Sequence, residues 1–321
     1  MIEMKFSFVK FKPKNNIDIV QKSKTSKEVL ERLQIFLDDN IDEPVELLLR
    51  NWKDQRNVMT YKEIREAILK GDLTEETFQL WQQDYSNLVS EKLENVWKNA
   101  MIAGAKGQPM MDRFASIFYY EWNTPRIKNW IVTRGAEFIT AITREQKMAI
   151  QTLLKEYTSG NYTVDELSRV IRPCIGLTKQ QSVANLRYYH QIKATLKKEH
   201  PRMKTEIAEG KAREAALKYA GRQHRSRAYT IAQTESAFAY NKGADEAIRQ
   251  AQEKELLGKV EKIWCTAGDT NVCDICQSLD GVRIELDSDF EFKGRELYEG
   301  QKQTPPAHPR CACAIEYIEV I

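Results

Sequence analysis

The feature that most constrains this 321-residue chain is a spaced set of cysteines and one histidine near its end. The set reads Cys273-x-x-Cys276, followed by His308-x-x-Cys311-x-Cys313. Two residues between two thiolates let both reach one metal ion from a tight turn, and structural zinc sites fill four positions with nitrogen and sulfur ligands. The spacing therefore predicts a structural zinc ion held by Cys273, Cys276, His308 and Cys311, with Cys313 as the substitute ligand.

The segment that contains these residues, 261–321, differs in composition from the chain before it. Glycine, aspartate, proline and cysteine become frequent, and short runs of β-type residues occur at 282–284 and 314–321. A module of roughly 60 residues buries too little apolar surface to be stable on its core alone. A metal ion that closes a loop of roughly 40 residues would supply the missing stability, so we expect a small α+β module stapled by zinc.

Two other interpretations of the cysteines remain open. A disulfide pair would require an oxidising compartment, for which the sequence gives no indication. A redox-active Cys-x-x-Cys of the thioredoxin type would require a βαβ setting, whereas the turn Leu279-Asp280-Gly281 follows the motif here. Cys174 and Cys265 have no partner at a ligand spacing, and we expect both to be small core residues.

Residues 25–255 carry the signals of α-helices. Thr124-Pro125 matches an N-cap followed by proline at the first helical position, and we expect that helix to end near Ile142. Thr74 opens an amphipathic stretch of roughly 30 residues that runs to Gly104 or Gly107. From residue 143 onward we expect short helices of roughly 12–16 residues each. Capping boxes mark five expected helix starts: Thr25 with Glu28, Thr60 with Glu63, Thr143 with Gln146, Thr163 with Glu166, and Thr178 with Gln181.

The prediction for the whole chain is a mainly α fold. Elongated helical N-terminal and middle regions, 1–139 and 140–260, precede the C-terminal module, 261–321. No apolar run approaches the roughly 18 residues that span a bilayer, and lysines interrupt the first 14 residues where a signal peptide would need an apolar core. We therefore expect a chain of the cytoplasm of the cell that makes it, with no membrane partner.

Positive charge is concentrated in one part of the helical region. Residues 181–230 contain 12 Lys+Arg and 4 Asp+Glu, a local charge of 12 − 4 = +8, whereas the whole chain carries +3. Contact with phosphate groups or an acidic partner is one interpretation, and a solvated helix face is the other. Few aromatic residues lie between the charges, which argues against stacking on single strands. The candidate nucleic-acid contacts are Lys197, Lys198, Arg222 and Arg225.

The motifs of several enzyme classes are missing from the sequence. No histidine is followed by x-Glu, so the ligand and acid pattern of the zinc deaminases is not present. The patterns H-E-x-x-H, G-x-x-x-x-G-K-[ST] and G-x-G-x-x-G are also missing. We therefore expect no catalysis by this chain. The alternatives are a metal-dependent hydrolase or nuclease with an open zinc position, and a soluble DNA-binding regulator.

Glu235 is the candidate catalytic residue of the enzyme alternative. It shares one helix face with small and apolar residues, and a carboxylate in such a place requires a partner. Arg227, two turns earlier on the same side, is the partner that the helical spacing offers. We expect a buried structural ion pair or a hydrogen bond to a loop, and catalysis by Glu235 as the alternative.

Several motifs together resemble one known family. They are Arg227…Thr234-Glu235…Asn241-x-Gly243, then Trp264, Asp269-x-x-x-Cys273-x-x-Cys276, Leu279-Asp280-Gly281, and Pro305-Pro306-x-His308-Pro309-x-Cys311-x-Cys313. In order and spacing this series resembles the phage Mu F-like minor head protein family, also called the phage head morphogenesis domain, over roughly residues 140–317. Relatives often have an arginine between the last two cysteines, whereas Ala312 stands there in this chain and Arg310 precedes the pair.

The resemblance implies a minor head protein of a tailed phage or prophage. Such proteins lie inside the virion head near the portal vertex, after assembly in the host cytoplasm, and assist head morphogenesis and the packaging or delivery of DNA. The implied partners are the phage portal protein, the major capsid or scaffolding protein, and packaged double-stranded DNA bound without sequence preference. Structural roles are implied for Arg227, Glu235, Asn241, Trp264 and Asp269. The resemblance does not imply a well-defined enzymatic activity.

Overall fold

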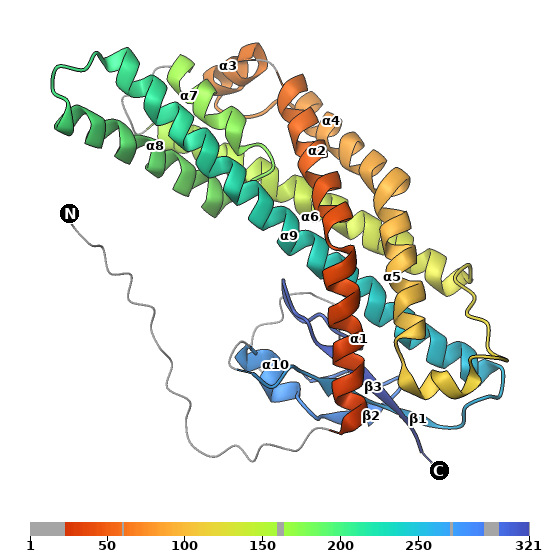
Figure 1. Ribbon diagram of the computed structural model, residues 1–321. Coiled ribbons are helices and arrows are strands. Elements are labelled where there is room, and N and C mark those ends of the chain that lie inside the picture. Colours follow the sequence, from red (N-terminus) through yellow and green to blue (C-terminus); the bar gives the residue numbers. More distant parts are fainter. Residues whose placement is uncertain (1–22, 60, 159–163, 270–271, 292–301, 321) are drawn as a thin grey trace.

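The computed structural model describes residues 23–59, 61–158, 164–269, 272–291 and 302–320. Helices dominate these residues and one small sheet lies near the C-terminus, which confirms the mainly α prediction (Figure 1). The α-helices are α1 (Lys24–Asn40), α2 (Asp42–Val58), α3 (Tyr61–Lys70), α4 (Glu75–Leu88), α5 (Glu94–Lys106), α6 (Pro125–Thr158), α7 (Val164–Ile171), α8 (Lys179–Glu199), α9 (Thr205–Glu253) and α10 (Asp274–Leu279). The shorter turns and strands are η1 (Val89–Leu93), η2 (Pro109–Phe114), η3 (Arg172–Cys174), β1 (Val260–Cys265), β2 (Arg283–Glu285) and β3 (Ala314–Glu319).

Helix α9 runs through the whole molecule, and its two halves differ in burial. It has 49 residues, which corresponds to about 74 Å of helix. In the first half the buried positions include Ala208, Ala212, Ala216 and Ala220, a spacing of four that marks one packed face against α8 and its neighbours. From Thr234 to Ala251 most residues are buried, because α5, α1 and β3 pack around this half. Helices α8 and α9 extend together away from the other elements as a hairpin (Figure 1).

The second half of α9 lies directly against the backbone of α5. A Cβ atom added to Gly243 would lie 2.0 Å from the carbonyl oxygen of Met101, and one added to Gly104 would lie 1.8 Å from the carbonyl oxygen of Tyr240. Both distances are far shorter than any contact that a methyl group tolerates. The two helices therefore need glycine at both crossing positions.

We predict that Gly243→Ala lowers the free energy of unfolding by about 3 kcal/mol, because the added methyl group forces the two backbones apart. Gly210→Ala is the matched control, since Gly210 is helical and has no atom within 4 Å of the added Cβ. The control should gain about 0.5–1 kcal/mol from helix propensity. Urea unfolding of the two variants measures both effects, and equal stability of Gly243→Ala and the parent chain would contradict the contact.

Several helix boundaries follow the sequence prediction. Thr74 caps α4 by accepting a hydrogen bond from the Thr77 N–H, and Thr178 forms the full capping box with Gln181 at the start of α8. Gly71, at φ +75°, ends α3. The long stretch after Thr74 is one continuous run of helix through α4, the π-turn η1 and α5.

Other predicted boundaries are wrong. Helix α6 passes through position 143 without interruption, because Thr143 is buried and donates its hydroxyl to the Ile139 carbonyl one turn back. Gln146 accepts a hydrogen bond from the Tyr85 hydroxyl instead of capping a helix. Ser23, not Thr25, caps α1. The expected short helices are also wrong, since α6, α8 and α9 have 34, 21 and 49 residues; Thr60 and Thr163 lie outside the described residues.

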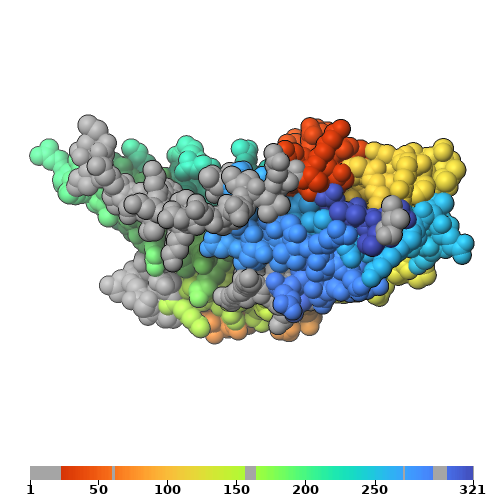
Figure 2. Space-filling view, turned by 90° about the horizontal axis from the view of Figure 1, so that it is seen from below, coloured from red at the N-terminus to blue at the C-terminus, as the bar shows by residue number. Residues whose placement is uncertain are grey.

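The sheet has the order β2-β1-β3, with both pairs antiparallel. It packs against α1 and the second half of α9. In the space-filling view the C-terminal module (blue) lies beside the start of α1 (red) (Figure 2). The buried carboxylate of Glu316 on β3 accepts hydrogen bonds from the hydroxyls of Ser23 and Ser26, so the first turn of α1 is held to the central sheet. Among the described residues no helix combines the length and apolarity needed to cross a bilayer.

The three expected regions of the chain remain a prediction. The first expected boundary, between residues 139 and 140, falls within α6. The second, between residues 260 and 261, falls within β1.

A lysine occupies the middle of the central strand. Lys262 pairs in register with Tyr317 on β3, and its side chain is 0% exposed. The Lys262 amine, the Tyr317 hydroxyl and one Asp245 carboxylate oxygen are all buried without a hydrogen-bond partner among the described residues. Burial lowers the pKa of Lys262 to about 8, because a low-dielectric interior disfavours the charged amine.

We predict that Lys262→Met raises the free energy of unfolding at pH 7 by roughly 2–3 kcal/mol. At this pH the folded parent chain buries a charged amine, which costs free energy because burial lowers the pKa of the amine below its value in the unfolded chain. Between pH 8 and the unfolded pKa near 10.5, the unfolded chain binds more protons, so the parent chain should gain stability with rising pH. The advantage of the variant should shrink over the same range. Urea unfolding at pH 7.0 and 9.5 measures it, and a variant that is less stable at both pH values would contradict this account.

Candidate metal centre

The fold brings all five predicted metal ligands into one cluster. Cys273 is the N-cap of α10, where its sulfur accepts a hydrogen bond from the Cys276 N–H, so one turn of helix presents both thiols on the same side. His308, Cys311 and Cys313 come from the segment that leads into β3. Cys276, Cys311 and Cys313 are buried, and His308 and Cys273 are partly exposed.

The distances within the cluster fit a tetrahedral metal site. The Cys273 and Cys276 sulfurs lie 3.0 and 3.2 Å from Nε2 of His308, and the Cys276 and Cys311 sulfurs lie 3.6 Å apart. Two sulfurs at a zinc–sulfur distance of about 2.3 Å would be roughly 3.8 Å apart in a tetrahedron. The ligand atoms form two groups within 4.8 Å, Cys273–Cys276–His308 and Cys276–Cys311–Cys313. Cys276 belongs to both groups and is therefore the central ligand candidate.

His308 is oriented as a metal ligand. Its Nδ1 lies 2.9 Å from the carbonyl oxygen of Pro309 and donates to it, which leaves the lone pair of Nε2 directed at the sulfurs. A backbone carbonyl in this position fixes the tautomer and the ring orientation of a metal-binding histidine. The residues present therefore fit a zinc ion, which would take these nitrogen and sulfur atoms as its ligands.

The cluster also lowers the cost of forming a thiolate. Hydrogen bonds from Cys276 and Cys313, together with the nearby His308 ring, hold the pKa of Cys311 well below its ordinary range. The Cys311 thiolate in turn raises the pKa of Cys276 and raises the pKa of His308 to about 9. One sulfur is thus ready to bind a cation, and binding would displace the protons of the other ligands.

The turn after α10 and the strand β1 form the frame of the cluster. Asp280 accepts a hydrogen bond from the Thr266 N–H, and Gly281, at φ +77°, donates its N–H to the Trp264 carbonyl. Trp264 is fully buried and packs edge-to-face on Phe290. Asp269 is exposed, and its backbone carbonyl accepts a hydrogen bond from the Val272 N–H.

Helix α9 holds the ligand segment directly. The Asn241 side chain donates to the Cys313 carbonyl at 3.2 Å, and the Arg310 N–H donates to the Thr234 hydroxyl at 3.0 Å. Arg310 adopts φ +62° and lies over the ring of Tyr229. These contacts give Thr234 and Asn241 structural roles, and neither contact could be foreseen from a helical pattern.

Glu235 and Arg227 form ion pairs, but not with each other, so the predicted partner was wrong. Both oxygens of the buried Glu235 accept hydrogen bonds from Arg134 of α6, at 2.9 and 2.5 Å. Arg227 instead donates to Glu145 and to the Gly176 carbonyl. A helix turns by about 100° per residue, so residues eight apart point in directions roughly 80° different. Because both oxygens of Glu235 are engaged, its position favours the structural role over a catalytic one.

The four candidate nucleic-acid contacts do not lie together. Lys197 and Lys198 are at the end of α8, next to the hairpin turn, and Lys197 donates to the Met203 carbonyl. Arg222 and Arg225 are exposed on α9, about 27 Å along that helix from its start at the hairpin turn. They line one hairpin at two levels rather than forming a single cluster.

Removal of the central ligand should abolish metal binding. We predict that Cys276→Ser lowers the zinc content of the purified protein from about one ion per chain to near zero, because Cys276 takes part in both ligand groups. Cys174→Ser is the control, since Cys174 is a buried thiol of the helical body. Elemental analysis and the near-UV circular dichroism of Trp264 during chelation measure the effect. A metal-free parent protein with free thiols and an intact module would reject the zinc site.

Part of the chain matches a known protein family. Residues 176–316 match the family described as Phage Mu protein F like protein. No curated protein matches the chain, and no solved structure matches it. The matched residues include α8, α9, β1, β2, the first three residues of β3 and all five ligand candidates. They begin later than the resemblance over 140–317 suggested. The resemblance is thus confirmed over these residues, which are similar to the Mu F-like family of phage head proteins.

Proposed function

From the match of residues 176–316 to the Mu F-like family, we propose that this chain is a minor head protein of a tailed phage or prophage. It acts at the portal vertex inside the head, where it assists assembly and the packaging or delivery of DNA. The family match carries this proposal, and the cluster of ligands in the matched segment agrees with it. The chain works through its surfaces rather than through catalysis, and its zinc ion is structural.

The α8–α9 hairpin supports contact with DNA in this proposal. It extends away from the other elements and contains most of the excess positive charge of residues 181–230 (Figure 1). Lysine and arginine side chains on such a surface bind phosphates without reading bases, and binding releases counterions from the DNA. The proposed partner of the hairpin is therefore packaged double-stranded DNA of any sequence.

We predict that the variant Lys198→Ala, Arg222→Ala, Arg225→Ala binds a 30-base-pair duplex less tightly than the parent chain and with a weaker dependence on salt. The slope of log K against log salt should fall by roughly 2–3, because three phosphate contacts are lost. Fluorescence anisotropy at several salt concentrations measures this slope.

The control for the hairpin variant changes the same number of charges elsewhere. Lys24, Lys27 and Lys53 are exposed on α1 and α2, and replacing them with alanine should leave the slope unchanged. A parent chain whose affinity does not depend on salt would remove DNA from the proposed partners. Equal losses in the two triple variants would show that bulk charge, not the hairpin, determines binding.

The portal assignment predicts a physical association. When the chain is produced together with the portal protein of the same phage, it should co-purify with portal rings, with fewer copies than portal subunits. Native mass spectrometry of the purified complex measures the ratio. Chains that remain separate from portal rings but occur in purified heads would move the proposal to the capsid or scaffolding protein, and purified chain that turns over a substrate would refute the non-enzymatic role.

A further inference from the structure

A polar hollow lies beside the second half of α9, near the end opposite the hairpin turn. Its volume is about 350 Å³. It is formed by the start of α6, the last turns of α9, the residue Asp287 after β2, and Gln303. Its lining side chains are all polar: Arg126, Lys242, Arg249, Gln252, Glu253, Asp287 and Gln303.

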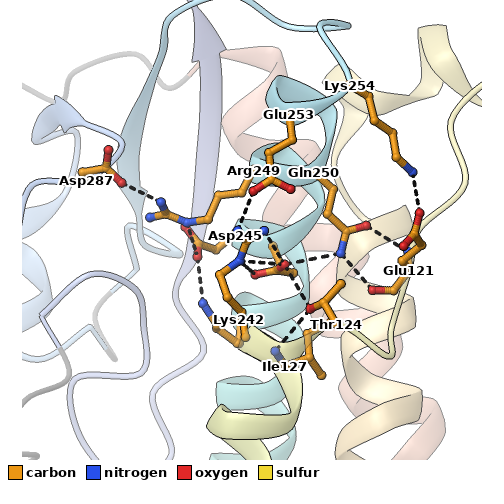
Figure 3. A network of polar contacts seen from close by, with 12 residues as sticks. Glu121, Thr124, Ile127, Lys242, Asp245, Arg249, Gln250, Glu253, Lys254 and Asp287 are labelled. Atoms are coloured by element: carbon orange, nitrogen blue, oxygen red, sulfur yellow. Dashed lines mark hydrogen bonds and ion pairs between the residues drawn. The ribbon is translucent and has the colours of Figure 1, made fainter.

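Buried carboxylates hold the three cations of this hollow in place. Asp245, 1% exposed, accepts from Lys242 at 3.0 Å and from Nε of Arg249 at 3.0 Å (Figure 3). Glu246, 0% exposed, accepts from Nε and Nη2 of Arg126 at 3.1 and 2.7 Å. A cation held by a buried carboxylate has lost its side-chain freedom before any ligand arrives, which reduces the entropy lost on binding.

Two exposed carboxylates accept hydrogen bonds from the Nη1 atoms of the two arginines. Asp287 accepts from Nη1 of Arg249, and Glu253 accepts from Nη1 of Arg126, while their side chains are 85% and 57% exposed. Among the described residues, the contacts of Arg249 Nη2 are the Leu286 carbonyl and the Gln303 side chain, both at 3.5 Å. Exposed ion pairs contribute little, so these two carboxylates can leave the arginines when a better anion binds.

We propose that this hollow binds a phosphate group. Two guanidinium groups and an ammonium group approach it from α6 and α9, an arrangement that suits a tetrahedral oxyanion, whereas a planar carboxylate is satisfied by one arginine fork. The phosphate belongs either to the DNA backbone or to a free phosphate ion. The buried Asp245 and Glu246 offset much of the positive charge, so the affinity for a single phosphate is modest, in the millimolar range.

The sharpest test removes the two competing carboxylates rather than the cations. In Asp287→Asn, Glu253→Gln the buried anchors stay intact, so the fold should be retained. Inorganic phosphate should bind roughly 3- to 10-fold more tightly than to the parent chain, because both arginines then have free donors. Isothermal titration with inorganic phosphate measures this, with potassium acetate at equal ionic strength as the comparison anion.

A second double variant controls for net charge. Asp112→Asn, Glu214→Gln also neutralises two exposed carboxylates in ion pairs, with Arg32 and Lys218, and should not change phosphate binding. The absence of phosphate binding in the parent and in Asp287→Asn, Glu253→Gln would overturn the proposal, as would an equal gain in both double variants or an equal affinity for acetate.

The source of the phosphate is decided by competition. A DNA duplex that displaces inorganic phosphate from the hollow identifies the DNA backbone as the ligand, and phosphate binding that a duplex leaves unchanged identifies a free phosphate ion. Both results support the site. Neither result depends on the portal or on the hairpin. The phosphate site can therefore be refuted while the proposed function stands, and the proposed function can be refuted while the site stands.

Discussion

The close approach of α5 to α9 is the constraint on which the rest of the structure depends. Glycine at positions 104 and 243 lets one helix backbone touch the other, and α9 is consequently buried on most sides from Thr234 to Ala251. On that buried half, Asn241 and Thr234 hold the segment that carries His308, Cys311 and Cys313. The same helix therefore begins in the long hairpin and joins the helical body to the candidate metal centre.

A metal ion bound by these ligands would have a structural role. The ligand segment is already attached to α9 and continues into β3, but α10 is a helix of only six residues. A helix of that length is not stable by itself in water. An ion shared between Cys273 and Cys276 on one side and His308 and Cys311 on the other would fix α10 to the sheet. A fully coordinated ion of this kind leaves no position for a substrate, which agrees with the lack of catalytic motifs.

The sequence predicted that the cysteines and His308 would lie together, whereas it predicted several helix boundaries wrongly. The cluster depends on residue types at close spacing, which a sequence displays directly. The capping patterns at Thr143 and Thr178 look alike in sequence, yet only Thr178 begins a helix, because Thr143 and Gln146 are buried in the body, Gln146 against Tyr85. The partner of Glu235 lies 101 residues earlier, at Arg134. Pairings of that kind depend on tertiary packing and could not be read from one helix.

The two groups of basic side chains on and beside α9 differ in a way that suggests different uses. The exposed arginines of the hairpin, such as Arg222 and Arg225, lie in a segment with three basic residues for each acidic one, so their field extends into solvent and is screened by salt. Lys242, Arg126 and Arg249 are instead held by buried carboxylates, so their field is short-range and their geometry is fixed. A mobile, extended polyanion suits the first surface, whereas the second selects a group by its shape. One continuous helix would thus carry a general electrostatic surface at one end and the proposed phosphate site, beside the C-terminal module, at the other.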